Sequence, residues 1–119
     1  MPFPVTSTEE LRQRGMLRIP ALLKYAKGMP CQNCRADDGT VVAAHSNMQE
    51  HGRGKDNPAH DCFHAWLCVR CHSWLDHGSV GLDPTGLYEP TRAGKVEMFM
   101  RAMCRTWYEL WRRNLVRVA

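Results

Sequence analysis

Four of the six cysteines form two pairs with the same spacing. The first pair is the C-x-x-C of CQNC, and the second is the C-x-x-C of CVRC. The four thiols belong to Cys31, Cys34, Cys68 and Cys71. A two-residue spacer lets both sulfurs of a tight turn face one ion at about 2.3 Å, and two such pairs complete a tetrahedral zinc site. The spacing therefore predicts one structural zinc ion bound by four thiolates.

Two other chemistries use cysteines at this spacing. A redox C-x-x-C usually needs only one pair, and an iron–sulfur cluster also takes four thiolates. The N-terminal residues lack the basic start and apolar run of a secretory signal, and no stretch reaches the apolar length of a membrane span. We therefore expect a cytoplasmic protein, not a membrane protein, with reduced thiols that favour metal binding. Of the other two cysteines, Cys104 is expected in the core and Cys62 has no assigned role.

A second pair of metal-binding side chains follows the fourth cysteine. His72 and Asp76 are four residues apart, so on a helix they share one face and can hold one divalent ion. An imidazole and a carboxylate suit Mg²⁺, Mn²⁺ or Zn²⁺ as a catalytic ion with open coordination positions. A surface contact between the two side chains, without an ion, is the alternative.

Two short strands and a helix are expected to position these residues. Thr40–Ala44 is a β-prone run that ends at His45, and Phe63–Leu67 is a second run that leads to Cys68. The two runs predict a β-hairpin. Cys71–His77 is expected to be helical and to end before Gly78. A chain of 119 residues has room for one small α+β domain with a modest hydrophobic core. Binding of a structural zinc ion would stabilise such a domain by on the order of 10–16 kcal/mol.

Longer segments flank this centre. Thr8–Lys27 is expected to be helical but broken at Gly15 and Pro20, and Lys95–Val116 is the clearest helix, with an apolar stripe at helical spacing. Lys and Arg outnumber acidic residues in both flanks: residues 1–30 carry a net charge of +3, residues 95–119 carry +4, and the centre carries −3. Basic flanks suit DNA as a partner, although they also serve solubility alone.

The order of these motifs resembles that of a known family. C-x-x-C, then A-H-S-N, then L-C-x-x-C-H-x-x-x-D, all within Cys31–Asp76, resembles the HNH (ββα-metal) endonucleases, and more narrowly the small YbcO-type nucleases of lambdoid prophages. A looser similarity extends into the last helix, around residues 102–111. The resemblance implies a treble-clef zinc finger and metal-dependent hydrolysis of DNA phosphodiester bonds by a phage or prophage protein in a bacterial cytoplasm.

The resemblance also divides the chain and assigns roles. The chain forms one domain whose parts are 1–30 (basic N-terminal helical arm), 31–78 (treble-clef core), 79–94 (linker) and 95–119 (C-terminal helix). His45 stands where the family has its general base, and His72 stands where it has a ligand of the catalytic ion. Asp76 matches a position one helical turn later that often supplies another ligand. Many members have Asp just before the base, where this chain has Ala44. His45 is therefore alternatively a ligand, with His51 or His60 as the base.

Further polar residues are candidates for the same site. Asn47 and Asp61, ranked ahead of His64, are expected to orient the base or to complete the metal shell. Arg53 and Lys55 lie between glycines in an expected exposed loop, where they can contact backbone phosphates or belong to a merely flexible segment. Of the four tryptophans, three are expected in the core rather than stacked on bases.

Two functions compete with the nuclease. The first is a non-catalytic zinc-finger module that binds DNA, in which the histidines only support the fold. The second is an adaptor in a phage recombination or replication assembly that uses the last helix as its contact surface. The apolar stripe on Lys95–Val116 can support a homodimer, or it can pack on the zinc centre of its own chain.

Overall fold

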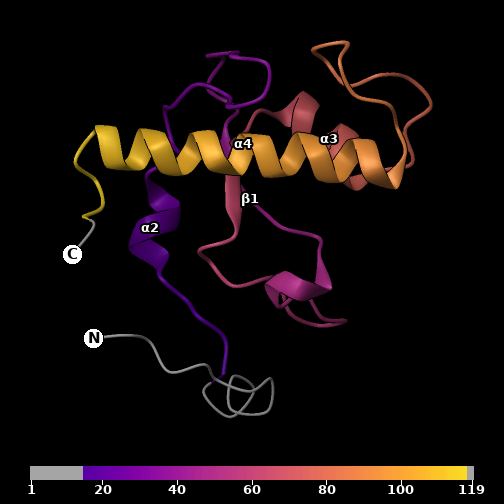
Figure 1. Cartoon of the computed structure of the whole chain (residues 1–119). Helices are drawn as coiled ribbons and strands as arrows, with labels where there is room; N and C mark the ends of the chain where they lie inside the picture. The colour runs from indigo at the N-terminus through magenta and orange to yellow at the C-terminus, as the bar shows by residue number, and fades with distance from the viewer. Residues whose placement is uncertain (1–14, 118–119) are drawn as a thin grey trace.

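The structure, a computed structural model, describes residues 15–117 (Figure 1). A two-stranded antiparallel sheet packs against one long helix, and two shorter helices contact the strands of this sheet. The elements are α2 (Pro20–Lys24), β1 (Val42–His45), the 3-10 turn η1 (Gln49–His51), β2 (His64–Leu67), α3 (Val69–Asp76) and α4 (Arg92–Arg112). The expected small α+β class with a hairpin and helices is confirmed.

The hairpin pairs the segments that the sequence predicted. Val42 faces Leu67, and His45 faces His64 at the other end of the ladder. In β1 only Ala44 is buried, whereas all four residues of β2 are buried. A strand that is buried on both faces needs mainly apolar side chains, and the run AWL provides them. The hairpin therefore runs through the centre of the core.

The outer edge of β2 is covered without a third strand. The backbone N–H of Trp66 donates to the hydroxyl of Thr106 on α4 at 3.0 Å, and the carbonyl of Trp66 accepts from the N–H of Gln32 at 2.8 Å. Unpaired backbone groups on a strand edge attract other strands, so both contacts protect the sheet. They also fix α4 and the first cysteine pair against the same strand.

Helix α4 begins at a side-chain cap. The hydroxyl of Thr91 accepts from the N–H of Gly94 at 3.0 Å, so the helix starts at Arg92, three residues before the expected Lys95, and it ends at Arg112 rather than Val116. Its buried face contains Met98, Phe99, Ala102, Met103, Thr106 and Leu110. The apolar stripe therefore packs on the core of its own chain. Neither α4 nor any other helix within residues 15–117 has the length and apolar character that crossing a bilayer requires.

Several expectations about single segments need correction. The helix expected over Thr8–Lys27 is confined, in its described part, to α2, because Pro20 occupies the first turn and residues 15–19 are irregular; residues 8–14 lie outside the described part. Cys104 is exposed rather than in the core. It lies outside the buried face of α4.

The tryptophans follow the expectation more closely. Trp66 and Trp74 are buried, and Trp107 is partly buried against the core, with its indole N–H donating to the carbonyl of Cys62 at 2.9 Å. Trp111 is 53% exposed. Three of the four therefore contribute to packing.

The segment 79–94, expected as a linker, is held to the core by one carboxylate. Asp83 is buried and accepts hydrogen bonds from the backbone N–H groups of Tyr88 at 2.9 Å and Leu87 at 3.1 Å. It also accepts from the side-chain amide of Asn33 at 2.8 Å. The loop is thus fixed to the first cysteine pair, and the top right of Figure 1 shows it between α3 and α4.

Candidate zinc centre and neighbouring polar clusters

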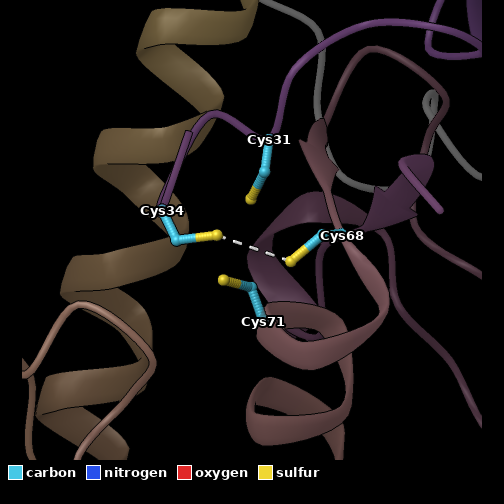
Figure 2. Close-up of side chains that lie close together, drawn as sticks. All are labelled: Cys31, Cys34, Cys68 and Cys71. Atoms are coloured by element: carbon cyan, nitrogen blue, oxygen red, sulfur yellow. Dashed lines mark hydrogen bonds between the residues drawn. The ribbon is translucent and has the colours of Figure 1, made fainter. Parts of the chain in front are cut away.

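The four cysteines of the two pairs meet at one point (Figure 2). Their sulfurs all lie within 4.8 Å of one another, and the Sγ atoms of Cys34 and Cys68 are 3.6 Å apart. In a tetrahedral site with zinc–sulfur bonds of about 2.3 Å, neighbouring sulfurs are about 3.8 Å apart. The donor set therefore fits a zinc ion, as the sequence predicted.

The first pair is shaped by a tight backbone turn. The N–H of Cys31 donates to the carbonyl of Ala36 at 2.8 Å, and the N–H of Arg35 donates to the carbonyl of Cys31 at 3.0 Å. Arg35 has a left-handed backbone with φ of 70°. The N–H of Asn33 points at the sulfur of Cys31 at 3.4 Å, a contact that favours the thiolate form. The turn directs both sulfurs to the same side, just before the hairpin.

The second pair lies where β2 ends and α3 begins. Cys68 is the N-cap residue of α3, and Cys71 lies in its first turn. The carbonyl of Cys68 accepts from the N–H of His72 at 2.9 Å. The positive end of a helix dipole stabilises nearby thiolates, so this position favours metal-binding cysteines.

The protonation of the buried sulfurs also suits metal binding. The pKa of Cys31 is lowered to about 4, chiefly because the thiol of Cys71 donates to its sulfur, and the pKa of Cys71 is raised by the same contact. The amide of Asn33 donates to the sulfur of Cys71 at 3.3 Å and to Asp83 at 2.8 Å. Asn33 and Asp83 therefore form an outer shell around the sulfurs, of the kind that orients metal ligands.

A second cluster forms where β1 ends. The Nε2–H of His45 donates to Asp61 at 2.9 Å, and the other carboxylate oxygen accepts from the N–H of Ile19 at 2.5 Å. Arg18 lies 3.4 Å from the same carboxylate. Burial alone would raise the pKa of Asp61, but the hydrogen bonds from His45 and Ile19 outweigh it and lower the pKa below its usual value. Asp61 is thus a buried carboxylate that fixes the half-exposed ring of His45.

A third cluster lies on α3 and beside it. The Nε2 of His72 is 2.8 Å from a carboxylate oxygen of Asp76, and the amide of Asn47 donates to the other oxygen at 2.7 Å. Burial would raise the pKa of Asp76, but hydrogen bonds from His72 and Asn47 outweigh it and lower the pKa, while Asp76 raises the pKa of His72. The helical spacing of His72 and Asp76 therefore brings their side chains together as expected, and Asn47 joins them.

The second and third clusters are close but use different carboxylates. His45 and Asn47 are two residues apart, so their Cα atoms are at most about 7 Å apart. Within residues 15–117, the four cysteines are the only group of three or more His, Cys, Asp or Glu side chains close enough to share one ion. His45, His72 and Asp76 therefore do not converge on a single point at metal-ligand distances.

The remaining predicted residues lie around the hairpin connection. Arg53 and Lys55 are exposed in the loop after η1. His64 is buried and donates through Nδ1 to the backbone carbonyl of Asp61 at 2.6 Å. It therefore holds the backbone at Asp61 rather than the Asp61 carboxylate.

The two histidines named as alternative bases are held by the protein. The ring of His51 stacks on Phe63 at 4.2 Å and is hydrogen-bonded to the hydroxyl of Ser46 at 2.6 Å. The Nδ1 of His60 accepts from the N–H of Leu17 at 3.0 Å. Both side chains are therefore engaged in structural contacts.

Sequence reasoning missed three residues that support these clusters. Arg18 lies in the N-terminal segment, and neither its type nor its position marks it as a partner of Asp61. Asn33 lies inside the first C-x-x-C, where an amide can reach a sulfur. Asp83 begins the turn sequence DPTG, and this was the available signal that its carboxylate organises a loop.

Comparisons with protein-family models, curated proteins and solved structures find no significant match to this chain. The fold and the cysteine site define a small α+β protein with a candidate four-cysteine zinc centre. What the neighbouring polar clusters do is inferred from their own geometry.

Proposed function

We propose that this chain is a metal-dependent endonuclease of the HNH type, built on a treble-clef zinc finger, that hydrolyses DNA phosphodiester bonds. The order of the elements supports the treble clef: a cysteine turn, a hairpin, and a helix whose first turn carries the second cysteine pair. The observation that carries the nuclease is the hydrogen bond between His45 and the buried Asp61, next to the His72–Asp76 pair.

His45 is the proposed general base. Because a carboxylate can only accept, Asp61 holds the proton of His45 on Nε2 and leaves Nδ1 to take a proton from water. A buried carboxylate that fixes the tautomer and orientation of a histidine is the arrangement of many hydrolytic bases. Asp61 is thus a positioning residue for His45.

His72, Asp76 and the amide oxygen of Asn47 are the proposed ligands of a catalytic ion. An imidazole nitrogen with two oxygen donors fits Mg²⁺, Mn²⁺ or Zn²⁺. When bound, such an ion would neutralise negative charge on the phosphate and on the leaving oxygen. Asp76 and Asn47 would then replace the acidic ligand that is lacking at Ala44. The ion would lie near the base because only Ser46 separates His45 from Asn47.

The proposed partner is DNA. Arg18 is next to Asp61, and Arg53 and Lys55 are exposed on the loop that leaves η1. Such side chains bind backbone phosphates without reading sequence. A phage-type nuclease in a bacterial cytoplasm would meet this substrate directly.

Plasmid nicking tests the proposal. Purified zinc-loaded protein is incubated with supercoiled plasmid and Mg²⁺ or Mn²⁺, and the His45→Ala variant is compared with Cys104→Ala, which truncates an exposed side chain of α4 outside the clusters. We expect His45→Ala to lower the nicking rate by about 100-fold or more, as loss of a general base does, and Cys104→Ala to leave it unchanged. Equal cutting by the parent and His45→Ala would reject the assigned site.

A DNA-binding module without catalysis is the second candidate. It is favoured because His45 and His72 each contact a different carboxylate, Asp61 and Asp76 respectively, instead of sharing one site. This function predicts DNA binding that weakens steeply with salt, because phosphate contacts release counterions, together with no nicking under any divalent ion.

A further inference from the structure

A groove of about 430 Å³ lies between the first half of α4 and residues 47–49, which follow β1. Its volume is in the range of pockets that hold small organic groups. Leu75, Val96 and Phe99 line its apolar part, and Arg92 and Lys95 are its charged side chains. Among residues 15–117, no acidic side chain lines it. The groove therefore combines an apolar surface with positive charge.

One face of α4 supplies four of the eight residues that line the groove. Arg92, Val96 and Phe99 recur at helical spacing, so they lie one above another. Phe99 is buried, with 3% of its surface exposed, and forms the floor of the groove, whereas Arg92 is exposed at its rim. The ammonium of Lys95 donates to the carbonyl of His77 at 2.6 Å, which holds this charge in place. The groove is thus built on a rigid element.

The groove begins at the proposed ligand cluster. Asn47 lines it, and the amide of the same residue donates to Asp76 at 2.7 Å. A polynucleotide with its phosphate at His72 and Asp76 would therefore have a neighbouring nucleotide at the groove. This step rests on the proposed function.

We propose that the groove receives one unpaired nucleotide of the substrate strand, so that the enzyme acts on single-stranded DNA. A base inside a duplex has both faces stacked and its edge paired, so it cannot lie on the apolar surface at Val96 unless it leaves the stack. An unpaired base can do so at little cost, and an apolar surface binds its face without regard to sequence. Arg92 and Lys95 then bind the phosphates on either side.

Filling the groove is the main test. Fluorescence anisotropy measures the Kd of full-length zinc-loaded protein for a labelled single-stranded oligonucleotide and for its duplex, without added divalent ion. We expect the parent to bind the single strand more tightly. Val96→Trp should raise the single-strand Kd roughly tenfold, the scale of one lost base-stacking contact, and should change the duplex Kd by less than about twofold. Ala93→Trp, which adds the same side chain at an exposed site outside the groove, should change neither.

A second pair of variants covers the case in which Val96→Trp does not fold, as judged by circular dichroism. Arg92→Gln and Arg101→Gln each remove one exposed charge from α4, but only Arg92 lines the groove. We expect Arg92→Gln to weaken single-strand binding and to reduce its salt slope by about one. Arg101→Gln, whose side chain is paired with Glu97 at 2.9 Å, should leave both nearly unchanged.

The outcomes separate the groove from the nuclease. Equal binding of single strand and duplex by the parent, an equal effect of Val96→Trp on both, or no DNA binding at all would overturn the groove proposal. Groove-dependent binding of single strands by a protein that cuts neither plasmid nor a single-stranded oligonucleotide with Mg²⁺ or Mn²⁺ would support the groove and reject the nuclease. Cutting that depends on His45 but is unchanged in Val96→Trp and Arg92→Gln would support the nuclease and reject the groove.

Discussion

Asp61 is the side chain on which the second cluster depends. Its carboxylate accepts from the ring of His45 and the backbone of Ile19, and it lies 3.4 Å from the guanidinium of Arg18. It therefore links the strand end to the segment that precedes α2. One buried carboxylate both orients the proposed base and fixes the N-terminal part of the described chain.

Asp61→Asn tests this dual role. The amide keeps the shape but can donate, so it no longer fixes the proton of His45 on Nε2. We expect nicking to fall by about 100-fold or more, by analogy with other bases that lose the orienting carboxylate. The free energy of unfolding at pH 7 should fall by about 1–3 kcal/mol because the donors around this buried side chain lose a charged acceptor.

The pH dependence of that stability difference follows from the pKa of Asp61. The folded-state pKa is lowered, so the carboxylate stabilises the protein above the ordinary pKa of about 3.9, and this contribution is lost as pH falls through the folded-state value. Urea unfolding of the parent and Asp61→Asn should show a difference in stability that narrows as the pH falls below about 5, where Asp61 begins to be protonated. A difference that grows as the pH falls below about 5 would contradict the assignment.

At the scale of elements, α4 begins where its first turn lies close to the backbone of the preceding loop and where that loop is held to the core. Gly94 lies in the first turn, where a Cβ atom would overlap the backbone carbonyl of Glu89. The preceding loop is fixed by Asp83, which also holds Asn33 beside the sulfurs. The start of α4 is thus coupled to the cysteine centre through a loop without regular structure.

Gly94→Ala should therefore destabilise the protein. In an open helix this change adds about 1 kcal/mol of stability, but here the methyl group must displace backbone, which costs roughly 1–3 kcal/mol. Gly54→Ala is the matched control, because a Cβ there has nothing within 4 Å. Thermal unfolding should show a lower Tm for Gly94→Ala only. An increase in Tm would mean that the loop before α4 yields easily.

The sequence predicted the elements better than their ends and their contacts. Strand runs, cysteine spacing and the apolar stripe depend on local periodicity, so the hairpin, α3 and α4 were expected within a few residues. The cap at Thr91 and the carboxylate of Asp83 act through loop geometry, which periodicity does not report. The exposure of Cys104 and the pairing of Asp61 with Arg18 depend on how distant segments pack, so composition could not reveal them.

At the scale of the whole molecule, the four cysteines join the parts of the chain. Cys31 and Cys34 precede the hairpin, and Cys68 and Cys71 follow it, so one ion bound by all four would close a long loop. Arg105 of α4 donates to the carbonyl of Gln32 at 3.0 Å, which links the last helix to the same turn. Without an ion, only contacts among four cysteine side chains would join these segments, which is a weak basis for a fold of this size.

Metal analysis of the reduced, purified protein tests this claim most directly. We predict one tightly bound zinc ion per chain by elemental mass spectrometry. Replacing Cys31 and Cys68 by Ser should abolish zinc binding and the cooperative unfolding transition, whereas Cys104→Ser, at an exposed cysteine outside the site, should preserve both. Protein that contains no tightly bound metal, or that unfolds with the same cooperativity and Tm after the two substitutions, would contradict the account.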